Sequence, residues 1–362
     1  MPVIDKFFKA LREQGGSDLH LQAGQPPKFR IHGRLEPLNM PPLSDGEARK
    51  LLYEMLDEKK RVRFDSNRDL DFAYEVPGVA RFRCNFFEQQ RGVGAVFRII
   101  PTKIKSMEEI GVPAEPLKRF CALNNGLVLV TGPTGSGKST TLAAMIDWIN
   151  CNESLHVITI EDPIEFVHEN KKSVLTQREV GNDTASFASA LRAAAREDPD
   201  VILVGEMRDQ ETIGLAITCA EMGQLVFGTL HTNSASKTID RIIDVFPEEQ
   251  QAQIRTMLSV SLQGVCAQLL MRRVDGQGRV PVNEILIASP ALGAIIREGA
   301  IHKVISYIES GRGEGMQLMD DSIMHRLKAG LVSPNEAYMK ATDKTKFEAM
   351  LARGGGAKGG GH

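Results

Sequence analysis

The sequence predicts an α/β protein, with a large domain built on a mostly parallel sheet and a small α+β domain before it. Three observations lead to this prediction. From residue 127 onward, short apolar runs alternate with helical patterns, and the runs lie at 127–131, 156–161, 201–205 and 225–230. A glycine-rich motif follows the first of these runs. The first hundred residues instead alternate polar and apolar residues between turns, which is typical of an antiparallel sheet.

Composition and charge are those of an ordinary globular protein and exclude several classes. Of the 362 residues, 42% are hydrophobic and 25% are charged, and the length predicts two domains. The net charge of −2 provides no overall basic field for binding nucleic acid. No apolar run approaches the roughly 18 residues of a membrane span. The mixed charges of the first residues do not form a signal peptide.

The cysteines predict neither a zinc knuckle nor a disulfide framework. No two of the five are close enough in sequence to form a CxxC pair: Cys84, Cys121, Cys151, Cys219 and Cys266. We therefore expect reduced, buried thiols in a cytoplasmic protein.

The small domain is predicted over 1–100. Apolar residues spaced for one helix face predict a helix over 2–14, and a capping box of Ser44 and Glu47 begins a helix over 44–62. The expected strands, recognised by their alternation, lie at 17–21, 28–31, 69–74, 80–86 and 94–100.

Three further segments complete the predicted organisation. Prolines punctuate 101–116, which we interpret as a linker. The large domain then spans 117–352 and ends in short helices near 291–298, 317–329 and 333–340. The glycine-rich end, 353–362, is low in complexity and is predicted to be disordered.

The glycine-rich motif fits G-x-x-x-x-G-K-[ST] and reads Gly132-Pro133-Thr134-Gly135-Ser136-Gly137-Lys138-Ser139. An apolar strand precedes it, and a helical pattern beginning with Thr140 follows, as a phosphate-binding loop requires. The loop amides would surround phosphate oxygens, Lys138 would supply a charge for the β- and γ-phosphates, and the Ser139 hydroxyl would reach Mg²⁺. The alternative is a glycine-rich turn without a ligand, but the flanking strand and helix favour the phosphate loop.

Carboxylates crowd the end of the strand predicted at 156–161, where the sequence continues Glu161-Asp162-Pro163-Ile164-Glu165. In a P-loop sheet this strand end faces the phosphates. Like charges so close together need a metal, water or a base to offset them. The alternative is a solvated acidic turn. A functional site is favoured because the carboxylates follow the first strand after the phosphate-loop helix.

Two more strands end in polar residues. The strand at 201–205 resembles a Walker B strand, but Gly205 stands where an aspartate usually holds Mg²⁺, so Glu206 is left to act on the metal or its waters. Arg208 and Asp209 follow and are predicted to form an ion pair. After the strand at 225–230, His231 is either a structural histidine or, with its neighbouring threonines, a sensor of the γ-phosphate.

These segments, in this order, resemble the Walker A, Asp, Walker B and His boxes of the type II/IV secretion ATPases. The segment 17–21, Ser-Asp-Leu-His-Leu, and the compact length resemble the PilT branch, the type IV pilus retraction ATPases. The resemblance covers about residues 2–350. It implies a PAS-like N-terminal domain, a RecA-like ATPase domain and assembly into a homohexamer.

The resemblance also implies roles for individual residues. Residues 132–140 would bind ATP, with Ser139 and Glu206 at Mg²⁺. Glu165 would be the catalytic carboxylate, with His231 also in the catalytic set. Arginines of the N-terminal domain would reach a nucleotide across a subunit interface and neutralise charge in the transition state. Arg83 and Arg98 are the candidates, Arg81 is a weaker one, and a surface ion pair is the alternative for each.

The sequence departs from the family pattern in two places. Gln224 stands where the His box of retraction ATPases usually begins with a second histidine. The family's retraction motif, Ala-Ile-Arg-Asn-Leu-Ile-Arg-Glu, corresponds here to 291–298, where Gly293 and Ala294 replace its first Arg and its Asn. The paired zinc cysteines of the assembly ATPases are not found, which favours the retraction branch.

We expect a cytoplasmic Mg-ATPase, peripheral at the inner membrane, that powers pilus retraction and twitching motility. It would act on an inner-membrane platform protein and, indirectly, on the pilin filament. An accessory retraction paralogue and a nucleotide-gated structural subunit with little turnover are the alternatives. A RecA-like nucleic-acid motor is disfavoured because the charge is balanced.

Overall fold

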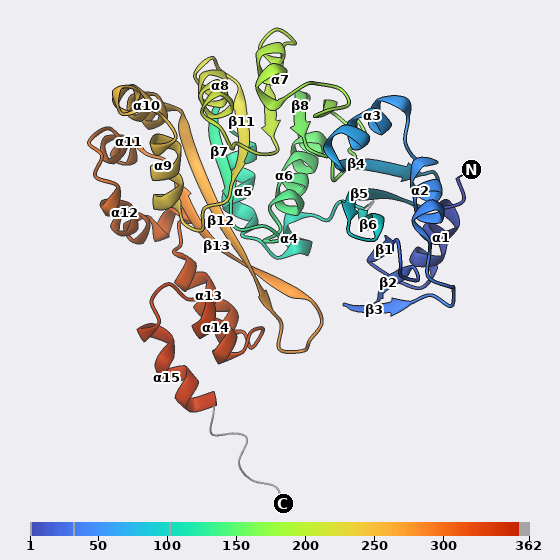
Figure 1. Cartoon of the computed structure of the whole chain (residues 1–362). Helices are drawn as coiled ribbons and strands as arrows, with labels where there is room; N and C mark the ends of the chain where they lie inside the picture. The colour runs from blue at the N-terminus through green and yellow to red at the C-terminus, as the bar shows by residue number, and fades with distance from the viewer. Residues whose placement is uncertain (1, 32, 101–102, 355–362) are drawn as a thin grey trace, which may run out of the picture. The chain divides into compact units, whose positions relative to one another are not determined.

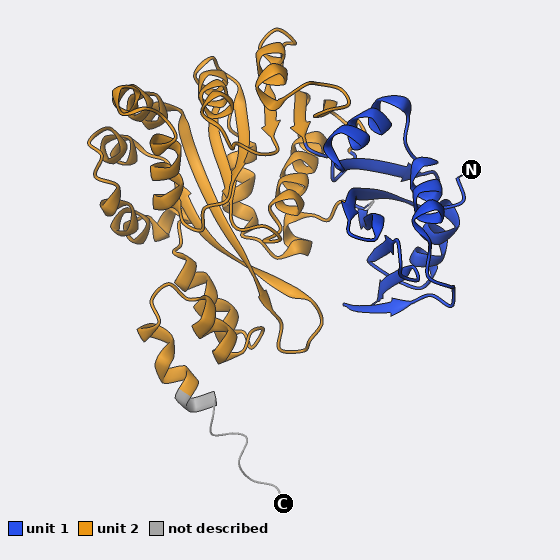
Figure 2. Ribbon diagram, in the orientation of Figure 1, with its two compact units in different colours: residues 1–103, 162–167 blue, residues 104–161, 168–362 orange. Residues whose placement is uncertain are grey.

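The computed structural model describes residues 2–31, 33–100 and 103–354 (Figure 1). The chain forms two compact units (Figure 2). The first holds the residues up to 103 together with 162–167, and the second holds 104–161 and everything from 168 onward. Within the predicted linker 101–116, residues 101–102 lie outside the described ranges. The same is true of 355–362, most of the tail that we predict to be disordered, whereas residues 345–354 form a helix.

Among its described residues, the first unit contains one six-stranded antiparallel sheet and three helices. The order of its strands in the sheet is β3-β2-β1-β6-β5-β4. The strands are β1 (Asp18–Gln22), β2 (Lys28–Ile31), β3 (Arg34–Pro37), β4 (Asp69–Val76), β5 (Ala80–Gln89) and β6 (Gly92–Ile100). The helices are α1 (Asp5–Glu13), α2 (Asp45–Tyr53) and α3 (Glu58–Asn67).

The single helix predicted over 44–62 is wrong, because α2 and α3 are separate helices. Asp57 ends the connection between them, and its side chain accepts a hydrogen bond from the Lys60 amide at 2.8 Å. Such a cap starts a new helix. The surrounding residues are good helix formers, so periodicity alone conceals the break.

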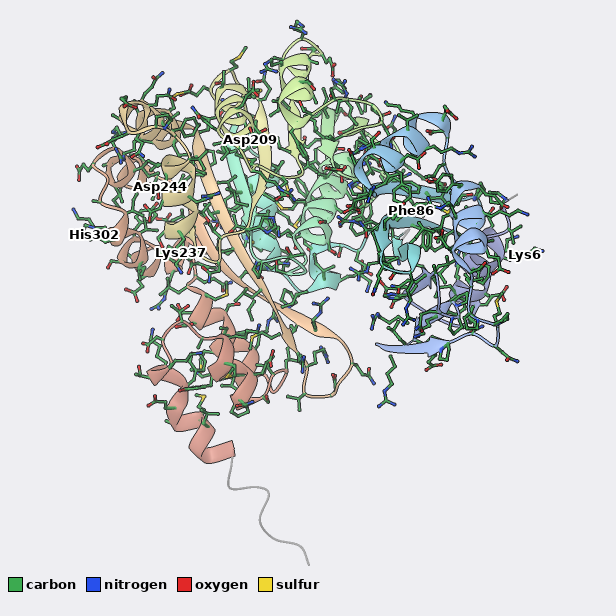
Figure 3. The ribbon with its side chains drawn as sticks, in the orientation of Figure 1. Lys6, Phe86, Asp209, Lys237, Asp244 and His302 are labelled. Carbon is green, nitrogen blue, oxygen red and sulfur yellow. The ribbon has the colours of Figure 1, made fainter. Side chains whose placement is uncertain are left out.

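An aromatic cluster forms the core of the first unit. On β5, Phe82, Cys84 and Phe86 alternate with outward residues and are all buried. Phe8 of α1 stacks on Phe82 with 4.1 Å between ring centroids. Phe86, labelled in Figure 3, meets Phe97 of β6 edge to face at 5.8 Å. This packing holds α1 against the sheet.

The second unit contains a seven-stranded sheet of order β13-β12-β7-β11-β10-β8-β9. Neighbouring strands are parallel except β12 and β13. The strands are β7 (Gly126–Thr131), β8 (His156–Glu161), β9 (Val174–Glu179), β10 (Val201–Val204), β11 (Leu225–Leu230), β12 (Leu262–Arg272) and β13 (Arg279–Ile287). This mostly parallel sheet confirms the predicted α/β class.

Helices cover both faces of this sheet. On β7, Leu127 and Leu129 pack on one face, and Val128 and Val130 pack on the other. The face of Val128 and Val130 meets α4 (Met107–Ile110), α5 (Ala114–Cys121) and α6 (Lys138–Asn152). The opposite face meets α7 (Phe187–Ala194), α8 (Gln210–Glu221), α9 (Ala235–Asp244), α10 (Glu248–Ser261), α11 (Pro290–Arg297) and α12 (Val304–Ser310).

The C-terminal helices form a separate small core with the β12–β13 hairpin. They are α13 (Met319–Lys328), α14 (Pro334–Lys340) and α15 (Thr345–Gly354). The sequence does not predict β9, β12 or β13. Helix α10 ends at Ser261 and β12 begins at Leu262, so no turn residue marks the change from helix to strand.

Candidate nucleotide site

The glycine-rich motif forms a loop between the end of β7 and the start of α6. Three of its residues have positive φ: Gly132 at 146°, Gly135 at 77° and Gly137 at 88°. Residues with a side chain rarely adopt such angles, so the loop conformation depends on these glycines. A glycine-rich loop that leads directly into a helix N-terminus can direct backbone amides at an anion.

The side chains of the loop divide into exposed and buried ones. Thr134 and Ser139 are exposed or half-buried, as is Thr140 beside them. The Lys138 ammonium donates hydrogen bonds to the Gly132 carbonyl oxygen at 2.8 Å and to the Pro133 carbonyl oxygen at 3.3 Å. The Lys138 side chain thus folds back onto the loop and contacts its carbonyl oxygens. A bound phosphate would compete with these oxygens for the ammonium group.

Ser136 carries a buried hydroxyl that has no hydrogen-bond partner among the described residues. Buried polar groups are nearly always paired, so this hydroxyl needs a ligand or water. Its place inside the loop is where a phosphate oxygen would provide an acceptor.

Glu206 is held by two cationic or polar side chains. Arg208 donates to its carboxylate, and the His231 Nε2 lies 2.8 Å from the same oxygen. Burial by itself would raise the pKa of Glu206, but the hydrogen bonds from Arg208 and His231 outweigh it and hold the pKa below its ordinary value. Glu206 and His231, which the sequence predicts separately as site residues, therefore lie in one cluster around an ionised carboxylate.

The predicted ion pair of Arg208 and Asp209 is wrong. Arg208 contacts Glu206 instead. Asp209, which is labelled in Figure 3, caps α8 and accepts a hydrogen bond from the Thr212 amide at 2.8 Å. A carboxylate at a helix N-terminus is satisfied by the free amides there and needs no cation.

Gly205 has a steric reason to lack a side chain. A Cβ at this position would lie 3.0 Å from the Ile160 carbonyl oxygen and 3.3 Å from the Glu161 Cα, on the neighbouring strand β8. The Thr229 hydroxyl donates to the Gly205 carbonyl oxygen at 2.6 Å. The ends of β8, β10 and β11 are thus drawn close together, which leaves Glu206 as the acid of this strand end.

The carboxylates after β8 do not share one environment. Glu161 accepts hydrogen bonds from the Thr159 hydroxyl at 2.7 Å and from Gln177 at 3.3 Å. Glu165 belongs to the segment 162–167 of the first unit, where Arg83 donates to it at 3.2 Å. The acidic turn is therefore held by specific partners rather than by solvent alone.

The three arginine candidates on β5 and β6 are all paired within the first unit. Arg83 contacts Glu165, and Arg81 lies 3.6 Å from Glu75. Arg98 donates to the buried Asp18 at 2.8 Å. An arginine that acts on a neighbour's nucleotide must first leave its present partner.

Two residues near the loop are not predicted by the sequence. Arg279, at the start of β13, donates to the Gly135 carbonyl oxygen at 3.2 Å. Gln268, inside β12, donates to the Ser136 carbonyl oxygen at 2.8 Å. Arg279 lies 144 positions after Gly135 in the chain, and Gln268 lies 132 positions after Ser136. No local signal could have identified them.

Comparison with known proteins shows the family of this chain. Residues 1–347 match the family described as Type II/IV secretion system protein. The chain is 54% identical over 344 residues to the type IV pilus retraction ATPase PilT of Pseudomonas aeruginosa, across 95% of this chain and 99% of that protein. This chain belongs to the PilT-type retraction ATPases of that family.

Two further relatives support the same family. A type IV pilus ATPase of Pseudomonas aeruginosa, PilU, is 38% identical over 351 residues, across 97% of this chain and 92% of that protein. A crystal structure of the pilus retraction motor PilT with bound ADP superposes with a TM-score of 0.88 at 46% identity, covering 97% of this chain and all of that one. The RecA-like fold of the second unit, with an antiparallel-sheet domain before it, is therefore confirmed.

The two departures from the retraction ATPase pattern lie just before β11 and on α11. Gln224 directly precedes β11, whereas His231 directly follows it. At about 3.3 Å per residue, the strand separates them by roughly 20 Å. Gly293 is buried on α11.

Among the residues that the structure describes, no helix combines the length and apolar character needed to cross a bilayer.

Proposed function

We propose that this protein is an ATP-hydrolysing motor that powers the retraction of type IV pili and so twitching motility. One observation carries the proposal: a glycine-shaped phosphate loop lies in the same RecA-like unit as the ionised Glu206 cluster. The chain also matches a pilus retraction ATPase over nearly the whole length of both proteins.

In this proposal the loop binds the phosphates of ATP. Backbone amides of the loop and of the first turn of α6 surround the oxygens, and the Ser136 hydroxyl donates to one of them. The Lys138 ammonium exchanges its carbonyl partners for the β- and γ-phosphates. ATP thereby replaces contacts that the loop otherwise makes with itself.

The site also fits Mg²⁺. This ion prefers hard oxygen ligands and usually keeps phosphate and water ligands beside one or two from the protein. Ser139 offers an accessible hydroxyl, and the lowered pKa of Glu206 keeps a carboxylate ionised. Within the described ranges no three His, Cys, Asp or Glu side chains gather in a group that could hold a metal ion. When bound, Mg²⁺ would neutralise charge on the transferring phosphoryl group.

Hydrolysis needs a base for the attacking water and positive charge in the transition state. Glu165 would serve as the base, and His231 would sense the γ-phosphate beside Glu206. Arg83 and Arg98 would supply charge across an interface of a homohexamer. The ring would act on an inner-membrane platform protein, and through it on the pilin filament, with only peripheral attachment to the membrane and no nucleic acid bound.

Two experiments test the proposal. Deletion of the gene in its host should produce surplus pili and abolish twitching, whereas missing pili would indicate an assembly motor. Lys138→Ala should abolish ATP hydrolysis in the folded protein, because no other loop side chain replaces the ammonium charge. Hydrolysis by wild-type protein also distinguishes a motor from a nucleotide-gated subunit. Full retraction by this protein alone would argue against an accessory paralogue.

A further inference from the structure

Gln268 lies where β12 passes the phosphate loop. Strand β12 runs parallel to β7, with Ala267 paired to Thr131, the last residue of β7. Gln268, the next residue of β12, therefore lies beside the start of the phosphate loop. It is only 2% exposed, although its amide is strongly polar. Such a group is retained inside a protein only when it is well paired.

The Gln268 side chain joins the loop to the helix that follows it. Its Nε2 donates to the Ser136 carbonyl oxygen at 2.8 Å. Its Oε1 accepts a hydrogen bond from the Thr141 hydroxyl of α6 at 2.9 Å. One amide thus fixes the position of the loop relative to the first turn of α6.

The glycines of the loop are shaped around the same residue. A Cβ on Gly132 would lie 2.2 Å from the Gln268 carbonyl oxygen, and a Cβ on Gly137 would lie 2.9 Å from the Gln268 Nε2. Real Cβ atoms essentially never make contacts this short, and at Gly132 the opposing atom belongs to the backbone and cannot swing aside as a side chain could. The loop therefore depends on glycine partly to make room for Gln268.

Asn283 on β13 extends this arrangement toward the C-terminal helices. It lies directly across from Gln268 in the antiparallel register, and its Nδ2 donates to the Gln268 Oε1 at 3.0 Å. The Asn283 backbone amide donates to the Ser322 hydroxyl of α13 at 3.1 Å. Its carbonyl oxygen accepts from the Gln317 side chain at 2.9 Å. Buried hydrogen bonds thus connect the loop with α13.

We propose that Gln268 is a positioning residue of the phosphate loop and that Asn283 couples it to α13. The inference rests on the proposed nucleotide site. By holding the Ser136 carbonyl away from the phosphates, Gln268 keeps the loop amides directed at them. The same amide satisfies the buried Thr141 hydroxyl, so its loss would release the loop and the helix together.

The test compares Gln268→Met and Gln268→Glu with Gln263→Met. Met keeps the length without the amide, and Glu keeps the shape but, when ionised, has no proton to donate to Ser136. Gln263 is half-buried on the same strand at the far end from the loop and provides the matched control. The readouts are KM and kcat for ATP with Mg²⁺, ADP affinity by calorimetry, and thermal stability.

We expect Gln268→Met and Gln268→Glu to raise KM and weaken ADP binding about tenfold, as loss of a buried hydrogen bond predicts, while Gln263→Met retains wild-type values. A merely structural role would lower thermal stability and leave KM and ADP affinity unchanged, which would overturn the inference. If wild-type protein does not bind ADP, the proposed nucleotide site itself fails.

A second set of variants tests whether Asn283 couples Gln268 to α13. Asn283→Ala should weaken ADP binding less than Gln268→Met does, and the double variant should bind no more weakly than Gln268→Met alone, because both changes break one connected arrangement. Additive losses would show that Asn283 acts independently and would overturn the coupling. If Asn283→Ala does not fold, Ser322→Ala provides the same comparison from α13.

Discussion

At the scale of single residues, the two candidate carboxylates have different surroundings. Glu206 is paired with Arg208 and His231 in the second unit, whereas Glu165 is paired with Arg83 in the first. These different partners fit the separate roles that we propose for the two acids: Glu206 at the metal and phosphate, and Glu165 toward the attacking water.

Glu165→Gln should preserve ATP binding and lower turnover by about two to four orders of magnitude, because an amide cannot accept a proton from water. Glu206→Gln should also lower turnover, and the turnover that remains should require a higher Mg²⁺ concentration. Measurement of turnover against Mg²⁺ concentration separates the two variants. Normal hydrolysis by Glu165→Gln would mean that Glu165 is not the base for the attacking water.

Arg208→Ala should shift the acid limb of the pH profile of kcat/KM to higher pH. Burial would still raise the pKa of Glu206, but the hydrogen bond from Arg208 that does most to lower this pKa would be lost. The pKa of Glu206 should therefore rise. Glu206 would then become protonated, and inactive, at a higher pH than in the wild type. The control is Arg312→Ala, which removes an arginine paired with Asp321 away from the loop. An unchanged acid limb would show that Glu206 does not limit activity.

At the scale of elements, two contacts between neighbouring secondary structures carry specific consequences. In the first unit, Tyr74 of β4 donates a hydrogen bond to Asp5 of α1 at 3.1 Å. In the second, α11 lies against α10 through Gly293, and Arg297 donates to the Ser259 hydroxyl at 3.1 Å. The first contact is sensitive to pH, and the second depends on the absence of a side chain.

Burial and the hydrogen bond to Asp5 raise the pKa of Tyr74 from 10.0 to about 12. A raised pKa means that this contact stabilises the fold fully below about pH 10 and loses that contribution as pH rises to about 12. Tyr74→Phe should therefore be less stable than the wild type by about 1 kcal/mol at about pH 8, with the difference shrinking above about pH 10. Urea unfolding at several pH values measures this, and a constant difference would contradict it.

The structure changes the expectation for the altered retraction motif. From the sequence, Gly293→Arg with Ala294→Asn should raise retraction at an unchanged ATPase rate. A Cβ at Gly293, however, would lie 2.8 Å from the Ser259 carbonyl oxygen of α10. Overpacking of this kind costs about 1–3 kcal/mol.

We therefore expect Gly293→Arg to lower the thermal midpoint by several degrees. Ala294→Asn, at a half-buried neighbouring position, should be nearly neutral and gives the cleaner test of retraction. A wild-type melting temperature for Gly293→Arg would show that α10 moves aside readily.

At the scale of the whole molecule, activity should depend on neighbouring subunits. Arg83→Ala should lose turnover and retain ATP binding, because its guanidinium either orients Glu165 or acts on a neighbour's nucleotide. Only the second role predicts that mixing Arg83→Ala with Lys138→Ala subunits restores some activity. Specific activity of the wild type should then rise with protein concentration. No recovery on mixing, with concentration-independent turnover, would favour the first role.

Local patterns in the sequence are sufficient to predict the phosphate loop and the strands around it. The phosphate loop, the strands β7, β8, β10 and β11 and the residues at their ends follow from motif spacing and periodicity within short segments. For the same reason, the sequence alone identifies Lys138, Glu206 and His231 as candidate site residues.

The remaining features depend on residues far apart in the chain, and they follow only from the tertiary fold. Segment 162–167 joins the first unit, the β12–β13 hairpin completes the second sheet, and Gln268 supports a loop residue that lies 132 positions before it. The closeness of α10 explains why Gly293 has no side chain. None of these contacts has a local signal, because each is formed only when folding brings distant segments together.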